Sequence, residues 1–163
     1  MEKKYQSYLN SAKKNKKSIK KTFKKLSQKK DNELDDLIFE GHESAFKEID
    51  CLKCANCCKT TGPLFIKTDI KRISKYLNLK PHEFEEKYLQ IDEDEDKVLK
   101  NLPCTFLDEN NYCTIYEVRP KACAEFPHTD RIKQKQILKL TEKNTMVCPA
   151  VAKIFIEIEQ KAV

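Results

Sequence analysis

The sequence has little glycine, no tryptophan and no long apolar run. Only 2 of its 163 residues are glycine, while 36% are charged. A phosphate-binding loop of the glycine-rich kind needs several closely spaced glycines, so we do not expect nucleotide binding of that kind. No stretch approaches the roughly 20 apolar residues of a membrane-spanning helix. We therefore expect a highly charged soluble protein, of a size typical of one domain.

An apolar signal segment is also missing from the start of the sequence, which reads MEKKYQSYLN. We therefore expect the protein in the cytoplasm, where thiols are kept reduced. The chain has eight cysteines. In a reducing compartment these are more typical of metal ligands than of disulfides. The disulfide alternative requires a signal that has been removed from the sequence.

Acidic residues are nearly absent from residues 1–30, which hold 12 lysines, one glutamate and no arginine. The segment carries a charge of +11, so the remaining residues sum to −5 within the overall +6. Its apolar residues recur every three to four positions and predict a basic amphipathic helix over 1–30, separate from a domain over 31–163. These apolar residues are Tyr5, Leu9, Ala12, Ile19, Phe23 and Leu26.

This basic helix has two interpretations. It either lies on the domain with its lysines in water, which we favour, or offers them to an acidic partner, a nucleic acid or an anionic surface. Specific recognition of bases is disfavoured, because the planar guanidinium group of arginine usually performs it.

The remaining sequence predicts a mostly α, small and irregular helical domain with one short β-hairpin. Helices are expected over 31–48, from an N-cap at Thr68, from Pro81, after Pro120 and after Cys148. The residues predicted to face the core in the last helix are Val151, Ile154, Phe155 and Ile158.

The hairpin is expected over residues 105–116, where two short apolar stretches flank DENNY. The acidic run DEDED at 92–96 is interpreted as a solvated turn. It is not a calcium loop, because Lys97 occupies the position where such a loop needs glycine.

The octapeptide CLKCANCC at 51–58 holds half of the cysteines. Cys51, Cys54 and Cys57 recur every three residues, so a turn-like backbone can aim the three sulfurs at one centre, as in a bacterial ferredoxin. A structural zinc site more often takes its ligands in pairs from two separated segments. The spacing therefore favours an iron–sulfur cluster, of the 4Fe–4S type, and leaves zinc as the alternative.

Cys58 follows Cys57 directly. Adjacent side chains usually project in different directions, so we expect the two residues to serve different metal centres. Two centres with four ligands each would use all eight cysteines.

The other candidate ligands are Cys104, Cys113, Cys123 and Cys148. Each stands next to a proline, a turn or a short helix, and Cys148 is expected at the N-cap of the last helix, where thiolates are stabilised. Lys59, Arg119 and Lys121 are expected to supply counter-charge to the thiolates.

Histidine is the other residue type considered as a ligand. His128 is a candidate ligand, or a donor to a ligated sulfur, with a surface position as the alternative. His42 and His82 are expected to be solvated.

The segments CLKCANCC, PCTFLDENNYCTIYEVRPKACAEFP and VCPA together resemble the YkgJ-type cysteine-cluster family, which is described as zinc- or iron-chelating. The resemblance covers roughly residues 50–150. It implies that the eight cysteines form the metal set, accompanied by Tyr116, Glu117, Arg119 and Pro120. The family's opening is CxxxCxxCC, whereas this chain has CxxCxxCC.

Two classes of function follow from these observations. In the first, which we favour, the metal is structural and the protein is a binding module. In the second, the metal cluster supports catalysis. A flagellin lysine methylase has a similar cysteine cluster, so the resemblance implies redox chemistry or methyl transfer to protein lysine as the enzymatic alternative.

Overall fold

A computed structural model describes residues 1–161 of the chain. The chain divides into two compact units, one formed by residues 1–54 and 127–163 (the first unit) and the other by residues 55–126 (the second unit). Within residues 1–161, no helix has the length and apolar character needed to span a membrane.

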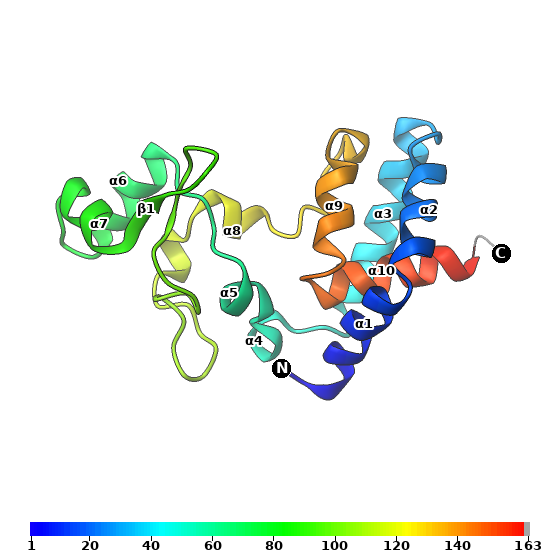
Figure 1. Ribbon diagram of the computed structural model, residues 1–163, viewed down its shortest axis with the longest axis horizontal. Helices are drawn as coiled ribbons and strands as arrows, with labels where there is room; N and C mark the ends of the chain where they lie inside the picture. Colours follow the sequence, from blue (N-terminus) through cyan, green and yellow to red (C-terminus); the bar gives the residue numbers. More distant parts are fainter. Residues whose placement is uncertain (162–163) are drawn as a thin grey trace. The chain divides into compact units, whose positions relative to one another are not determined.

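The first unit is entirely helical in its regular structure (Figure 1). Its elements are α1 (Lys3–Lys14), α2 (Lys16–Leu26), α3 (Asp31–Phe46), α4 (Cys51–Cys54), η2 (Gln134–Ile137), α9 (Leu138–Asn144) and α10 (Pro149–Lys161). Helix α10 runs across α1, α2, α3 and α9 and contacts each of them.

The second unit combines short helices with one pair of strands. Its elements are α5 (Asn56–Thr60), α6 (Lys67–Tyr76), α7 (Pro81–Tyr88), β1 (Leu89–Ile91), β2 (Lys97–Leu99), η1 (Tyr116–Val118) and α8 (Lys121–Glu125). The mostly α fold with a short β-hairpin is therefore confirmed.

The hairpin forms at a different place from the one predicted. Strands β1 and β2 pair antiparallel, with Leu89 opposite Leu99 and Ile91 opposite Lys97. The acidic residues 92–96 connect them as an exposed turn, as expected. The predicted hairpin over 105–116 is reduced to a single bridge between Leu107 and Cys113. The Asp108 carboxylate accepts hydrogen bonds from the backbone of Asn110 and Tyr112 there, so a side chain organises the turn instead of a ladder.

The basic segment 1–30 forms two helices rather than one. Its backbone leaves the helical region at Asn15, with φ −97° and ψ 19°, between α1 and α2. The predicted apolar stripe is nevertheless buried along both helices, at Tyr5, Leu9, Ala12, Ile19, Phe23 and Leu26. Hydrophobic burial therefore holds both helices in the first unit, with most lysines exposed.

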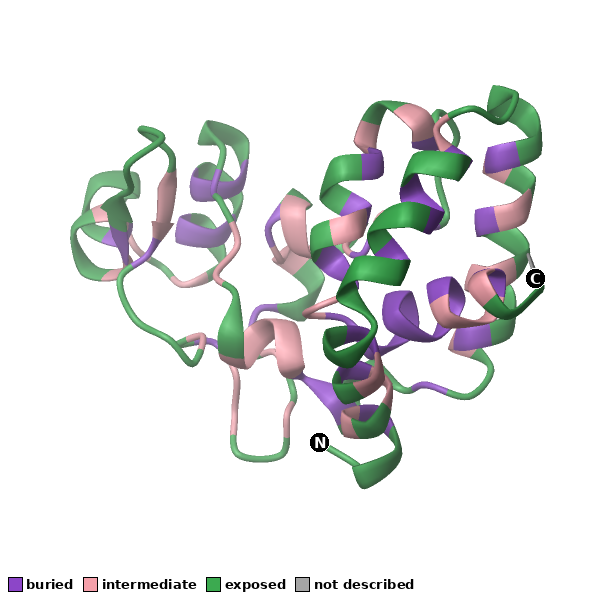
Figure 2. Cartoon of the chain, turned by 45° about the vertical axis from the view of Figure 1, so that its right-hand side comes forward, coloured by how far each residue is buried: buried purple, intermediate pink, exposed green. Residues whose placement is uncertain are grey.

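Helix α10 is the centre of the first unit. The four residues predicted to face the core are buried, and so are all the others from Pro149 to Phe155 (Figure 2). All of these residues except Lys153 are apolar, and a helix that is buried on nearly every side has to be surrounded by other helices. The contacts of α10 with four helices are the consequence.

Gly41 allows α3 to approach α10 closely. A Cβ atom added at Gly41 would stand 2.7 Å from Cγ2 of Ile154, well inside the normal contact distance between carbon atoms. In a sequence, a glycine inside a helix indicates only a local loss of helix stability. In the structure it is the position where the two helices meet.

The core of the second unit is built around Phe84 of α7. The ring centroid of Phe84 lies 5.2 Å from that of Tyr88, 6.0 Å from that of Phe65 and 6.2 Å from that of Phe106. Cys104 and Cys113 pack against this core at its edge. The aromatic cluster therefore fixes the loop that carries two of the candidate ligands.

Candidate metal centre

The octapeptide forms two short helices with a sharp change of direction between them. Helices α4 and α5 are separated by Ala55, which has a left-handed conformation with φ 47°. This conformation is unfavourable for a residue with a Cβ atom, and Ala55 is held in it while buried. The boundary between the two units falls between Cys54 and Ala55. Cys51 and Cys54 thus belong to the first unit, and Cys57 and Cys58 to the second.

In the second unit, the backbone brings the cysteine pair against Cys104. The Cys58 carbonyl accepts a hydrogen bond from the Cys104 amide at 2.8 Å. Cys113 lies opposite Leu107 in the β-bridge, and the Leu107 amide in turn donates to the Cys104 carbonyl at 3.0 Å. Residues more than 40 positions apart in the sequence are therefore neighbours at this site.

The thiols of Cys58, Cys104, Cys113 and Cys123 lie close enough for a charge on one to act on the others. Burial raises the pKa of Cys104 and Cys113, and it raises that of Cys123 to about 12. The negative charge of a Cys58 thiolate raises each of these three pKa values further. We call these four residues the second-unit thiol set.

The side chains of Cys57 and Cys58 do not project in different directions, contrary to the expectation from the sequence. The sulfurs of Cys57 and Cys58 lie 3.9 Å apart, so both side chains point to the same side of the backbone. A hydrogen bond from the Cys57 thiol lowers the pKa of Cys58 to about 7, and the Lys59 cation acts in the same direction. Cys58 therefore has the most readily ionised thiol of the second-unit thiol set.

In the first unit, Cys148 stands at the start of α10, as predicted. The backbone amides of Val151 and Ala150 lower the pKa of Cys148, as expected for a thiol at the start of a helix. The expected stabilisation of the thiolate is nevertheless outweighed, because burial raises the pKa of Cys148 to about 12. A metal cation at the sulfur would reverse this balance.

Cys51 and Cys54 act on Cys148 electrostatically. Negative charge on either residue raises the pKa of Cys148 further, so the three thiols are neighbours. Cys54 is buried, with its sulfur 3.9 Å from the Met1 sulfur, and Cys51 is exposed. We call Cys51, Cys54 and Cys148 the first-unit thiol set.

Asp69 and Arg72, which were not predicted as site residues, form hydrogen bonds with the segment that leads to Cys123. The buried carboxylate of Asp69 in α6 accepts hydrogen bonds from the Lys121 amide at 3.2 Å and from Arg72 Nη2 at 2.7 Å. Arg72 also donates to the carbonyls of Val118 and Arg119. An aspartate at the third position of a helix is a capping signal, and the Asp69 carboxylate does accept from the Ile66 amide. Its long-range contact with α8 has no sequence signal.

Two of the three cations that were expected to supply counter-charge to the thiolates, Lys59 and Arg119, act on cysteines. Lys59 lowers the pKa of Cys58, and Arg119 lowers the pKa values of Cys113 and Cys123. Arg119 is itself fixed, with its guanidinium group 3.9 Å from the centroid of the Tyr116 ring. Lys121 instead pairs with Glu125 at 3.5 Å.

The histidines differ in their surroundings. His42 is half-buried, with Nδ1 2.8 Å from Thr129 Oγ1 and its ring 4.5 Å from that of Phe46, so the prediction that it is solvated is wrong. His82 is exposed, as predicted. His128 has a left-handed backbone with φ 66°, and its carbonyl accepts a hydrogen bond from Gln134 Nε2 at 2.7 Å.

The donor atoms of both thiol sets are sulfurs, which suit zinc and iron–sulfur clusters better than hard cations. Within residues 1–161, no three histidine, cysteine or acidic side chains converge as closely as the ligands of a single ion. Each set nevertheless groups thiols whose negative charges oppose one another, and all of these thiols except that of Cys51 are half-buried or buried. A thiophilic cation would offset this repulsion, so the residues present fit a metal centre.

Comparisons with known proteins agree with this chemistry. No solved structure matches the chain. One family model matches residues 50–149, and its description is CxxCxxCC, a "putative zinc- or iron-chelating domain". The pattern in that name is the spacing of Cys51, Cys54, Cys57 and Cys58, so the expectation that this chain departs from the family's opening is wrong, and the match extends through Cys148. The chain therefore belongs to the CxxCxxCC family of zinc- or iron-chelating domains.

Proposed function

We propose that the protein is a structural metal-binding module with two separate thiolate centres. The second-unit thiol set holds one centre, and the first-unit thiol set contributes to the other. The observation that carries the proposal is the gathering of four distant cysteines in residues 55–126, where Cys104 bonds to the backbone of Cys58 and charge on Cys58 reaches Cys113 and Cys123. Membership of a chelating family supports it.

The proposed group is an iron–sulfur cluster, with zinc as the competing ligand. The three-residue spacing of Cys51, Cys54 and Cys57 supports the cluster, since ferredoxins use the same spacing. Cys57 belongs to the second unit, where its sulfur lies 3.9 Å from that of Cys58, so we do not assign it to the first-unit thiol set. A bound cluster would supply one-electron chemistry in addition to cross-linking the chain.

A structural role is supported by the places of the second-unit ligands. Cys58 lies in a five-residue helix, Cys104 and Cys113 lie in irregular segments, and Cys123 lies in another five-residue helix. Such short elements are weakly stable by themselves, so ligation of their side chains would couple metal binding to folding. The thiolates have to stay reduced, so we propose a reducing compartment such as the cytoplasm.

Metal and sulfide analysis of protein purified without oxygen tests this proposal. The expected result is iron with a matching amount of acid-labile sulfide, and visible absorption that disappears when the iron is chelated. A colourless protein with zinc and no sulfide would overturn the cluster assignment and leave the thiolate module intact. Protein that binds neither metal after reconstitution would overturn the module itself.

A further inference from the structure

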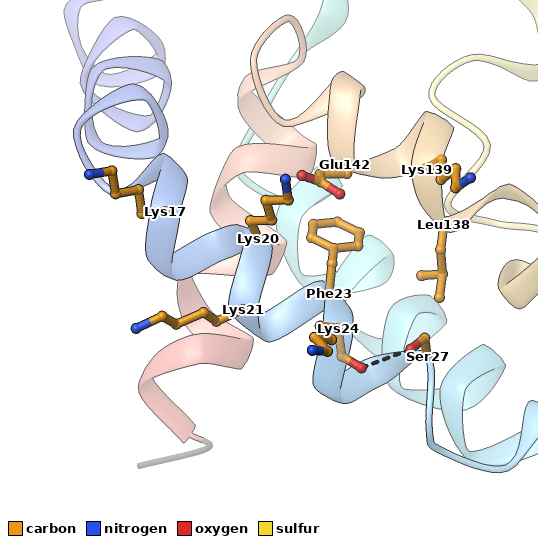
Figure 3. Close-up of a pocket in the computed structure, with 9 residues that line it drawn as sticks. All are labelled: Lys17, Lys20, Lys21, Phe23, Lys24, Ser27, Leu138, Lys139 and Glu142. Atoms are coloured by element: carbon orange, nitrogen blue, oxygen red, sulfur yellow. Dashed lines mark hydrogen bonds between the residues drawn. The ribbon is translucent and has the colours of Figure 1, made fainter.

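A groove lined by lysines lies in the first unit, between α2 and α9. Its volume is about 560 Å³, and its basic lining residues are Lys17, Lys20, Lys21 and Lys24 of α2 and Lys139 of α9. In Figure 3, Lys20 extends beside the ring of Phe23 toward Glu142, Lys17 and Lys21 point away from that ring, and Leu138 and Lys139 come from α9. We call this feature the lysine groove.

The α2 lysines of the groove follow helical spacing. Lys17, Lys20, Lys21 and Lys24 stand at positions i, i+3, i+4 and i+7, which are neighbouring positions on the helix surface. Crowding of like charges on one surface is unfavourable unless a partner neutralises them.

These lysines are not neutralised by the part of the chain that the structure describes. Lys4, Lys135 and Lys153 of the same unit each pair with a carboxylate, of Glu48, Asp31 and Glu157 respectively. Within residues 1–161, none of the five groove lysines forms an ion pair of this kind, and the lining holds a single carboxylate, that of Glu142. Their charge is therefore available to a ligand from outside.

The floor of the groove is apolar. Phe23 and Leu138 contribute to the lining, although little of either side chain is exposed. The ring of Phe23 is stacked on that of Phe155, with centroids 4.2 Å apart, so the floor is fixed by the core. The volume lies in the range of pockets that enclose a ligand group, about 300–1,000 Å³.

We propose that the lysine groove binds an acidic peptide segment of a partner protein. One apolar side chain of the peptide lies on the floor formed by Phe23 and Leu138, and flanking carboxylates pair with lysines of α2 and with Lys139. This occupant matches both features of the groove, the uncompensated cations and the apolar floor. The site is independent of the proposed metal centres.

Two other polyanions match the groove less well. A nucleic acid would use the lysines, but it has no aliphatic side chain for the floor, and the lining offers no exposed aromatic ring on which a base could stack. A lipid surface would need an exposed apolar helix face, whereas Ile19, Phe23 and Leu26 of α2 are buried.

Fluorescence anisotropy with full-length, metal-loaded protein tests the proposal. The probe is a short labelled peptide with one central leucine between runs of glutamate. The double variant Lys20→Glu/Lys24→Glu removes two groove cations and should weaken binding about tenfold or more. The control is Lys16→Glu/Lys25→Glu, which changes the net charge by the same amount at two exposed positions of α2 outside the groove. The affinity of this control for the peptide should stay within about twofold of that of the wild type.

Two further binding measurements test the charge of the groove and its floor. Glu142→Gln removes the one carboxylate of the groove lining and should tighten binding of the peptide about twofold. Replacing the central leucine of the peptide with serine should weaken binding several-fold. Circular dichroism confirms that each variant is folded.

Specific outcomes would overturn the proposal. Equal losses in the groove and control variants would show that net charge alone attracts the peptide. An unchanged affinity of the serine peptide would remove the role of the floor. Tighter binding of single-stranded DNA or of phosphatidylserine vesicles, lost in the groove variant alone, would assign the groove to one of those polyanions instead.

Discussion

A substitution at Gly41 tests how closely a single residue allows α3 to pack against α10. Gly41→Ala places a Cβ 2.7 Å from Ile154 Cγ2, and Ile154 is too stiff at its branched Cβ to move away freely. We expect the free energy of unfolding to fall by about 1–3 kcal/mol, as measured by chemical denaturation.

The other glycine of the chain is the matched control. A Cβ at Gly62 would lie 3.9 Å from its nearest neighbours, which is an ordinary contact, so Gly62→Ala should leave stability unchanged or raise it slightly. In an Ile154→Ala background, Gly41→Ala should cost little, because the clashing methyl is gone. The same loss in both backgrounds would contradict the packing explanation.

Single residues also show what the sequence can and cannot predict. The position of Cys148 at the start of a helix follows from the proline after it, and the structure confirms it. The sequence does not predict that the pKa of Cys148 is raised, because burial of the sulfur depends on the helices packed around α10. In the same way, the half-buried place of His42 depends on Thr129, which is 87 residues away.

At the scale of elements, Asp69 connects α6 to the start of α8. Its carboxylate is 1% exposed and accepts bonds from the Arg72 side chain and the Lys121 amide. Asp69→Ala leaves these donors without their acceptor, so we expect a loss of about 3 kcal/mol in the free energy of unfolding. Because Cys123 lies in α8, the metal of the second unit should also pass to a chelator faster.

Asp36→Ala is the control for this element, since Asp36 is exposed in α3. Its free energy of unfolding and its rate of metal release should match those of the wild type, within about 0.5 kcal/mol for the former. If Asp69→Ala also behaves like the wild type, the carboxylate does not hold α8.

Most helices were predictable because their apolar residues recur at helical spacing. The buried stripes of residues 1–30 and of α10 are examples. The interruption at Asn15 was not predicted, because a stripe of this kind continues across one residue of irregular backbone. The hairpin was placed wrongly because TFL and CTIY resemble strands, while Asp108 closes their turn without a ladder.

At the scale of the whole molecule, the sequence identified the cysteines but not their grouping. Eight ligands that lie far apart in the chain divide into sets only when the path of the chain is known. The hydrogen bond from the Cys104 amide to the Cys58 carbonyl brings these two cysteines together. No periodic pattern in the sequence predicts this bond. The basic segment is a similar case, since the sequence shows its charge and the structure shows the groove beside α2.

Removal of the metal should loosen the two units unequally. In the second unit, Cys104 and Cys113 pack at the edge of the core and Cys58 and Cys123 lie in short helices. In the first unit, α10 is buried among four helices that do not depend on a ligand. We therefore expect chelation to lower the thermal midpoint by about 10 °C and to speed amide hydrogen exchange mainly in residues 55–126.

Hydrogen exchange read by mass spectrometry gives this comparison directly. Equal acceleration in α10 and in residues 104–123 would show that the metal holds the whole chain. An unchanged midpoint after chelation would show that ligation contributes nothing to stability.

If Cys58 and Cys148 belong to different metal centres, substitutions of the two residues should remove metal independently, and the metal content per chain measures this. Each of Cys58→Ser, Cys123→Ser and Cys148→Ser should lose about one centre. Cys58→Ser/Cys123→Ser should lose no more metal than either single variant, because both residues belong to the second-unit thiol set. Cys58→Ser/Cys148→Ser should lose both centres. If the two double variants retain the same amount of metal, in chains that circular dichroism shows to be folded, the division into two thiol sets is wrong.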